Sequence, residues 1–276
     1  MAGGRIRFGL ALALPLALLL PPAAGLVAGL LPSANPGMAS DACSRSPASI
    51  WESLGVSLRK FSGTAPEQPD WAQLCHYARD NARLLQSGEP VRAVFIGDSV
   101  TQNWAVGRPG LFTGGIVNRG IGGQTSGQVL LRFSADALAL KPQAIHLMVG
   151  LNDATGLNGP TRPEEFQANL RAMLLLAKAQ GVRVVVGAIP PASRVHWAPH
   201  LAPAPRVRAL NAWLAQLARE QGAAFVDYYT PLAAADGGLK AEYALDPAHP
   251  NARAYAVMEQ QLREPLAAAL AAPITR

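Results

Sequence analysis

The chain has 276 residues, of which 50% are hydrophobic and 15% charged, and its formal net charge is +6. This composition suits a globular protein with a sizeable core and excludes wholesale disorder. No run of Lys and Arg with interleaved aromatic residues is present, so the positive charge does not indicate a groove for nucleic acid. At this length we expect a single folded domain behind an N-terminal segment.

The N-terminus reads as a targeting segment. Arg5 and Arg7 precede an apolar run over residues 8–20, which has the charge pattern and the length of a secretory signal peptide. The apolar character resumes over residues 23–31, so an uncleaved membrane anchor is the alternative interpretation. Either interpretation predicts an exported protein, which is periplasmic, extracellular or held at the membrane by this segment.

A domain boundary follows from this segment. Small residues around positions 37–40 are compatible with a cleavage site, and residues 32–49 have the proline-containing, polar composition of a linker. We therefore expect residues 1–39 to be a signal peptide or an N-terminal membrane anchor with its linker. Residues 40–276 are expected to form the folded domain.

The chain contains two cysteines, Cys43 and Cys75. After export both would be in an oxidising compartment, so a disulfide between them is a reasonable hypothesis. It would hold the segment after the signal against a helix predicted over residues 70–85. The alternative is two unrelated thiols.

From residue 91 onward, short β-branched runs alternate with longer segments of helical periodicity. The predicted strands are residues 91–96, 115–118, 144–149, 182–189 and 223–227. The predicted helices between and after them are residues 124–140, 163–180, 205–221 and 252–270. Alternation of strand and helix is typical of a parallel sheet covered on both faces, in which ligands bind beyond the carboxyl ends of the strands.

The first such strand end carries Gly97-Asp98-Ser99. A serine placed between a strand and a helix exposes its hydroxyl, and its own backbone N–H is free to donate to an oxyanion. The alternative is an ordinary helix N-cap, since Asp and Ser are both favoured there.

Asp246-Pro247-Ala248-His249 places a carboxylate three residues before an imidazole. At that spacing Asp246 can accept from the Nδ1–H of His249, which leaves Nε2 facing outward as a base. The alternative is a surface turn in which the histidine has no catalytic role.

Two further strand ends supply candidate donors. The stretch Asn118-Arg119-Gly120-Ile121-Gly122-Gly123-Gln124-Thr125 is glycine-rich, but it lacks the spacing of a dinucleotide loop and the lysine of a phosphate loop. Its glycines let backbone N–H groups approach a ligand closely. After the next strand, Asn152 in Gly150-Leu151-Asn152-Asp153 offers a side-chain amide, unless it is an ordinary turn residue.

The four stretches together resemble the SGNH hydrolase superfamily, in its GDSL-like lipase/acylhydrolase family. The resemblance covers residues 91–266, with Gly97-Asp98-Ser99, the glycine-rich loop, Gly150-x-Asn152-Asp153 and Asp246-x-x-His249-Pro250-Asn251 in the family's order. It implies an α/β protein with a flavodoxin-like three-layer α/β/α sandwich and a five-stranded parallel sheet. It also implies ester hydrolysis through a covalent acyl-enzyme.

By position, the resemblance makes Ser99 the nucleophile, His249 the general base and then acid, and Asp246 the residue that orients His249. The oxyanion hole would consist of the Ser99 backbone, the Gly123 backbone N–H rather than that of Gly122, and the Asn152 side chain. Asp98 and Asp153 are expected to brace the loops rather than react.

No cofactor and no metal is expected, since the mechanism needs none and no cluster of His and Cys has ligand spacing. The expected substrate is a small-molecule or glycan ester with a short acyl group, such as an O-acetyl ester. A lysophospholipase-type lipid acylhydrolase and a non-catalytic envelope binding protein are the alternatives. The segment 190–205, with Trp197, is expected to overhang the site, where Trp197 contacts a sugar ring or an acyl chain or merely anchors the loop.

Overall fold

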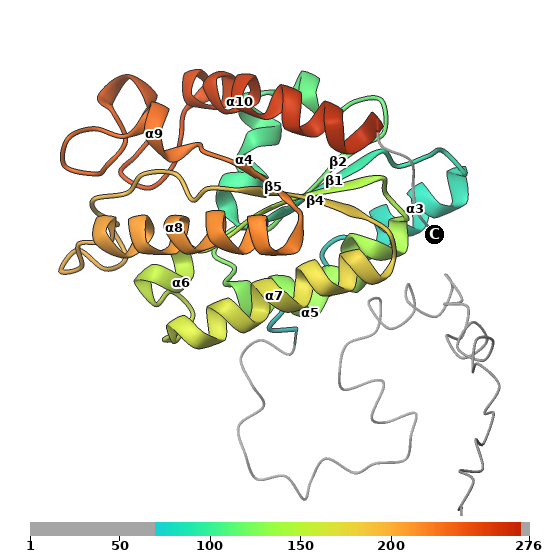
Figure 1. Cartoon of the computed structure of the whole chain (residues 1–276), viewed down its shortest axis with the longest axis horizontal. Coiled ribbons are helices and arrows are strands. Elements are labelled where there is room, and N and C mark those ends of the chain that lie inside the picture. The colour runs from blue at the N-terminus through green and yellow to red at the C-terminus, as the bar shows by residue number, and fades with distance from the viewer. Residues whose placement is uncertain (1–69, 272–276) are drawn as a thin grey trace, which may run out of the picture. The chain divides into compact units, whose positions relative to one another are not determined.

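The computed structural model describes residues 70–271, which contain one five-stranded sheet with helices on both faces (Figure 1). The strands are β1 (Ala93–Gly97), β2 (Ile116–Gly120), β3 (Ala144–Met148), β4 (Arg183–Gly187) and β5 (Ala224–Val226). All neighbouring strands are parallel, in the order β2-β1-β3-β4-β5. The α/β class and the flavodoxin-like architecture expected from the sequence are confirmed.

The described residues form eight α-helices. They are α3 (Ala78–Ser87), α4 (Ser99–Gly107), α5 (Ser126–Asp136), α6 (Leu151–Thr155), α7 (Pro163–Ala179), α8 (Ala204–Gln221), α9 (Tyr229–Leu232) and α10 (Ala252–Ala271). Short 3-10 turns are η2 (Pro109–Leu111), η3 (Leu138–Leu140) and η4 (Ala241–Tyr243). Among the described residues, no helix is both long and apolar enough to cross a membrane.

The sheet separates two apolar cores. In β1 every residue is buried, and alternate side chains enter opposite cores: Val94 and Ile96 pack with α5, α7 and α8, while Phe95 packs with α4 and α10. Figure 1 shows α10 and α4 on one side of the sheet and α5, α7 and α8 on the other. A strand buried on both faces needs apolar side chains throughout, which explains the continuous Ala-Val-Phe-Ile run.

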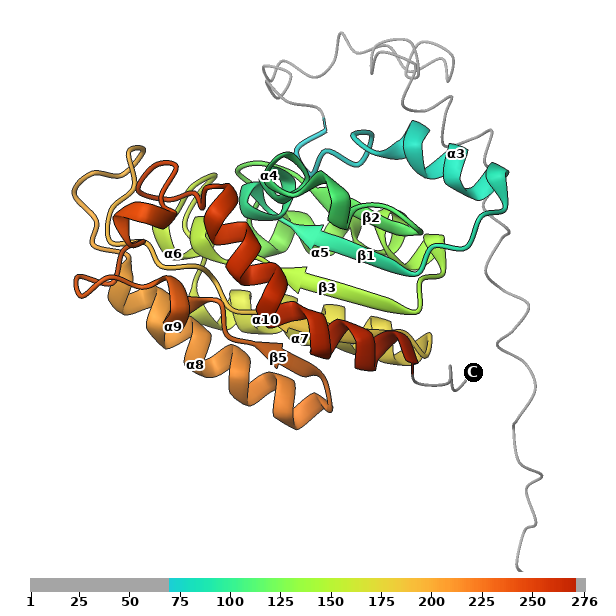
Figure 2. The same ribbon diagram turned by 90° about the horizontal axis from the view of Figure 1, so that it is seen from above.

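The strand order creates one crevice at the edge of the sheet. The chain leaves β1 toward β2 on one side and returns past it to β3 on the other, so the loops after β1 and β3 diverge. Figure 2 shows β1 and β3 as arrows pointing the same way, with α6 beyond their tips. Ligands of open parallel sheets bind at this switch point, where Ser99 and Asn152 both lie.

The prediction of a helix over residues 70–85 is wrong at its start, because α3 begins at Ala78, eight residues later. The backbone of Gln73 has φ of 54°, which interrupts a right-handed helix. The carboxylate of Asp70 accepts from the N–H groups of Leu74 and Cys75 at 2.8 and 2.9 Å and so stabilises a turn instead.

The expected signal or anchor segment and Cys43 lie outside the described residues. Cys75 is disulfide-bonded.

Candidate active site

Ser99 is the first residue of α4, directly after the turn that ends β1. Gly97 is required at this turn, because a Cβ there would collide with the carbonyl oxygen of Met148 on β3 and with Oγ1 of Thr101. Asp98 caps the helix, with its Oδ1 accepting from the Val100 N–H at 2.9 Å. The strand, the glycine turn and the cap therefore fix the position of the Ser99 hydroxyl.

Ser99, His249 and Asp246 are brought together by the fold. Ser99 Oγ lies 3.0 Å from His249 Nε2, across 150 residues of chain. His249 Nδ1 lies 2.8 Å from Asp246 Oδ2 and 3.0 Å from Asp246 Oδ1. A serine, an imidazole and a carboxylate hydrogen-bonded in series have the geometry by which a base can take the serine proton.

The loop that carries His249 is held rigidly. Asp246 Oδ1 accepts from the backbone N–H groups of Ala248 at 2.8 Å and His249 at 2.9 Å. The strand-like bridge between Ala244 and Pro250 closes the loop at its base. Asp246 thus orients the imidazole and its own loop at once.

Asp246 stays ionised in this setting. Partial burial raises the pKa of Asp246, but hydrogen bonds from the Ala248 N–H and from the ring and N–H of His249, with the attraction of that ring, outweigh it. The net result is a pKa below its ordinary value. The carboxylate is therefore available to stabilise a protonated imidazole near neutral pH.

Three groups at the ends of β1, β2 and β3 are candidate oxyanion donors. Ser99 starts a helix, so its N–H precedes the first intrahelical hydrogen bond. Gly123 adopts φ of +78°, and within residues 70–271 its N–H has no acceptor, whereas the Gly122 N–H donates to Gln102 Oε1 at 2.9 Å. This difference supports the choice of Gly123 over Gly122.

Asn152 is the third candidate donor, and the structure places it inside α6 rather than in a simple turn. Its Nδ2 donates one hydrogen to the carbonyl oxygen of Gln124 at 2.8 Å. A side-chain amide carries two hydrogens, so one remains for a ligand while the other holds the orientation.

Asp98 and Asp153 connect the loops. The Asp98 carboxylate accepts from the N–H groups of Val100 and Gly150, and burial raises its pKa to about 6. Asp153 accepts from the Ser126 N–H at 2.9 Å and from the Ser126 hydroxyl at 2.6 Å. These contacts hold the loops after β1, β2 and β3 to one another, and a loop-bracing role accounts for both carboxylates.

Sequence reasoning missed two residues that contact this site from behind, Gln124 and Arg132. Both are buried, and Arg132 Nη2 donates to the carbonyl oxygen of Gly97 at 2.8 Å. The signal was available, since Arg132 shares the spacing of the apolar Val129 and Phe133 on a helix that also buries Ser126, Gln128 and Asp136. A polar residue on the core face of a helix needs a buried partner.

The other described histidines lie elsewhere. His146 is buried in β3, with Nε2 3.0 Å from the Tyr228 hydroxyl, and burial lowers its pKa to about 3. His76, His196 and His200 are exposed. None of them is hydrogen-bonded to Ser99 or to Asp246 among the contacts of the described chain.

The segment predicted to overhang the site is tied to α6. The Trp197 indole N–H donates to Thr155 Oγ1 at 3.1 Å, and Val195 and Ala198 pack into the core of α7 and α8. Trp197 therefore anchors this loop to Thr155, which lies three residues after Asn152 in α6.

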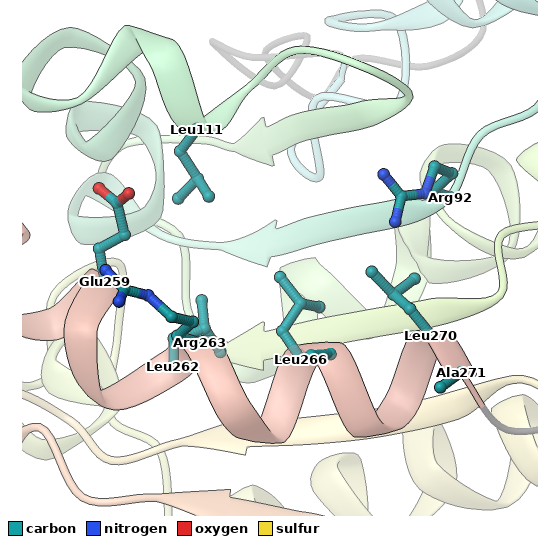
Figure 3. Close-up of a pocket in the computed structure, with 9 residues that line it drawn as sticks. Arg92, Leu111, Glu259, Leu262, Arg263, Leu266, Leu270 and Ala271 are labelled. Carbon is teal, nitrogen blue, oxygen red and sulfur yellow. The ribbon is translucent and has the colours of Figure 1, made fainter.

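Two concavities of the described region lie apart from Ser99. One of about 550 Å³ lies between α6, α7 and α8, where Phe166, Leu210 and Trp213 line it. The other, of about 390 Å³, is an open groove along α10 between Leu262 and Leu270 (Figure 3). Arg92 in its wall precedes β1, whereas Ser99 follows that strand, so the groove is at the opposite end of the sheet.

A flavodoxin-like sandwich with a serine, a histidine and a carboxylate linked at its switch point has the architecture of an ester hydrolase. The chain belongs to the GDSL-like Lipase/Acylhydrolase family, whose model matches residues 95–257. The family predicted from the four sequence blocks is therefore confirmed, and membership supports a hydrolase that acts on esters.

Several known proteins resemble this chain. A Bacteroides fragilis protein assigned as an acylhydrolase is 34% identical, with a TM-score of 0.70 over 74% of this chain and 100% of its own. A GDSL-like lipase of Bacteroides thetaiotaomicron is 31% identical, with a TM-score of 0.68 over 72% of this chain and 98% of its own. An acetyl xylan esterase of Geobacillus stearothermophilus shares the fold, at 20% identity and a TM-score of 0.53 over 65% of this chain and 95% of its own.

A curated relative matches only a short stretch. An uncharacterized lipoprotein of Bacillus subtilis is 36% identical over 74 residues, which are 26% of this chain and 30% of that protein. The chain therefore spans under a third of the length of this curated relative.

Proposed function

We propose that this chain is an exported serine esterase that cleaves short-chain carboxylic esters through an acyl-enzyme. The observation that carries the proposal is the hydrogen-bonded series of Asp246, His249 and Ser99. The N–H of Gly123 and the amide of Asn152 are the proposed oxyanion donors. A binding protein has no need for a nucleophile, a base and oxyanion donors in one place.

In the proposed reaction, Ser99 Oγ attacks the ester carbonyl while His249 Nε2 takes its proton. The negative charge that develops on the carbonyl oxygen is stabilised by the N–H groups of Ser99 and Gly123 and by the Asn152 amide. Collapse of the tetrahedral intermediate releases the alcohol, to which His249 returns the proton. Water, deprotonated by His249, then releases the acid and restores Ser99.

The preference for short acyl groups is part of this proposal. The acetyl xylan esterase that shares the fold supports an O-acetyl ester of a glycan or small molecule as substrate. The resemblance to a GDSL-like lipase keeps a lipid acyl group as the second candidate.

Export is proposed from the sequence of residues 1–39, which lie outside the described residues, and from the resemblance to a lipoprotein. Cell fractionation and N-terminal sequencing of the mature protein test it. Activity confined to the cytoplasmic fraction would contradict export.

The catalytic proposal is tested by hydrolysis of a p-nitrophenyl ester series, from acetate to palmitate. We expect turnover by the wild type with an optimum at acetate or butyrate, and loss of turnover in Ser99→Ala and His249→Ala. His200→Ala is the matched control, because it removes an exposed histidine that makes no contact with Ser99. An optimum at long chains would favour the lipid acylhydrolase, and a folded wild type without Ser99-dependent turnover would contradict the esterase proposal.

A further inference from the structure

Arg132 is a fully buried guanidinium behind the candidate oxyanion hole. It lies on α5 with 0% of its side chain exposed. Its Nε donates to Gln124 Oε1 at 2.6 Å, and its Nη2 donates to the carbonyl oxygen of Gly97 at 2.8 Å. One planar cation therefore donates hydrogen bonds to the last residue of β1 and to the loop after β2 at the same time.

Each of these contacts leads to an oxyanion donor. Gly97 is two residues before Ser99, and Gln124 directly follows Gly123. The backbone carbonyl of Gln124 accepts the hydrogen bond that orients the Asn152 amide, at 2.8 Å. Arg132 thus bonds the residue two positions before Ser99 and the residue directly after Gly123. The Asn152 amide is connected to it through its hydrogen bond to Gln124.

The Gly97 carbonyl also joins the two loops. It accepts from the Ile121 N–H at 3.1 Å in addition to Arg132. The Gln124 side chain is likewise held from both ends, since its Nε2 donates to the Ala72 carbonyl at 2.9 Å. Neither loop can shift without breaking a hydrogen bond to Arg132 or to Gln124.

Stability alone does not account for this arrangement. The charge of Arg132 is compensated by Asp136, whose Oδ2 lies 3.2 Å from Nη1 and which is itself fully buried. A buried ion pair commonly contributes little to folding, since desolvation of both charges offsets their attraction. Its value is then a fixed geometry for the groups that it bonds.

We propose that Arg132, acting through Gln124 and Gly97, is a positioning residue that sets the spacing of the three oxyanion donors, an inference that rests on the proposed esterase function. The guanidinium does not touch the substrate. It determines where the N–H groups of Ser99 and Gly123 and the Asn152 amide point when charge develops on the carbonyl oxygen.

The test compares wild type, Arg132→Lys and Gln124→Met in ester hydrolysis, with Ser99→Ala as the inactive reference. An ammonium group cannot bond Gly97 and Gln124 in the fork geometry of Arg132. We expect kcat to fall about 10- to 100-fold with KM within about twofold, since misplaced donors weaken transition-state binding and leave substrate binding intact. Affinity for methylboronic acid, which adds to a serine hydroxyl as a tetrahedral anion, should fall by a similar factor.

Asn81→Ala is the matched control for a merely structural effect. Asn81 is buried and bonds Asp136 at 2.7 Å and Arg119 at 2.8 Å, at the far end of the same network. We expect it to lower the melting temperature while kcat and boronate affinity remain near those of the wild type.

The outcomes distinguish the positioning role of Arg132 from the proposed esterase function. If Arg132→Lys and Gln124→Met fold and keep wild-type kcat and boronate affinity, or lose them only as much as Asn81→Ala does, the positioning role is wrong while the esterase proposal stands. If the wild type itself has no Ser99-dependent turnover, both are overturned. Should Arg132→Lys fail to fold, Gln124→Met decides, because it keeps the ion pair of Arg132 with Asp136 and removes the link from Arg132 to the loop, together with the hydrogen bond from Gln124 to Ala72.

Discussion

At the scale of the residue, Asn152 and His249 each use one polar group to fix the orientation of the side chain and keep a second polar group for the proposed reaction. Asn152 donates one amide hydrogen to Gln124 and keeps the second, and His249 engages Asp246 through Nδ1 and Ser99 through Nε2. Preorganised donors of this kind cost no reorganisation at the moment of reaction. The buried Asp98 carboxylate likewise acts as a single side chain, since it accepts from N–H groups in the turns after both β1 and β3.

Replacement of Asn152 by alanine removes a single proposed oxyanion donor. We expect kcat for p-nitrophenyl acetate to fall on the order of 10²-fold, with KM and the far-ultraviolet circular dichroism spectrum nearly unchanged. Steady-state kinetics and a thermal melt check both parts. A folded variant with wild-type kcat would remove Asn152 from the site.

Asp98→Asn tests the raised pKa of Asp98, which is about 6 because burial penalises the charged form. An unfolded aspartic acid loses its proton near pH 4, so between about pH 4 and 6 the folded state holds more protons at Asp98, and the contribution of this group to stability falls as pH rises. We expect the free energy of unfolding of Asp98→Asn, relative to wild type, to improve by about 2 kcal/mol from pH 4 to pH 7. Urea titrations at both pH values measure this difference, and a difference independent of pH would contradict the raised pKa.

At the scale of the element, periodicity in the sequence predicts what regular hydrogen bonding controls. All five strands and the helices α5, α7, α8 and α10 were predicted within four residues of their bounds, because apolar spacing reports burial directly. The short helix α6 was not predicted, since five residues are too few to show a period. The late start of α3 depends on the local contacts of Asp70, which composition does not reveal.

The site was predictable to the same depth. Ser99, Asp246, His249, Gly123 and Asn152 follow strand ends or a short D-x-x-H spacing, which marks them as candidates, and the family resemblance assigns their proposed roles. Gln124 and Arg132 act through contacts that exist only in three dimensions, with Gly97 reached across 35 residues. A buried polar residue in a helix signals that a partner exists and does not identify it.

One hydrogen bond, from Trp197 to Thr155, joins the loop of residues 190–203 to α6 in addition to apolar packing. Because the partners couple directly, Trp197→Phe and Thr155→Val should each destabilise the protein, and the double variant should lose about 1 kcal/mol less than their sum. Denaturant titrations of the four proteins give the coupling. Strict additivity would show that the two side chains do not interact.

At the scale of the whole molecule, the two cores differ in chemistry. The core of α5, α7 and α8 is almost wholly aliphatic, whereas the core of α4 and α10 encloses an aromatic cluster around His146. His146 stacks on Phe95 with ring centroids 4.6 Å apart and meets Trp104 edge-on at 5.7 Å. A basic group at the centre of the sheet makes the stability of the entire fold depend on acidity.

The direction of that dependence follows from the pKa of His146, which burial lowers to about 3. An unfolded histidine takes up a proton below about pH 6.5, while the buried imidazole stays neutral, so falling pH favours the unfolded state. Between pH 7 and pH 4.5 the wild type should lose about 3 kcal/mol more than His146→Gln, a non-titrating variant that can still bond the Tyr228 hydroxyl. His200→Gln should follow the wild type, because its side chain is exposed in the folded protein as well. Asp98 acts in the opposite direction over the same range and is present in all three proteins, so it cancels in the comparison. Parallel loss of stability in His146→Gln and wild type would mean that the imidazole is protonated inside the fold and that the aromatic core admits water.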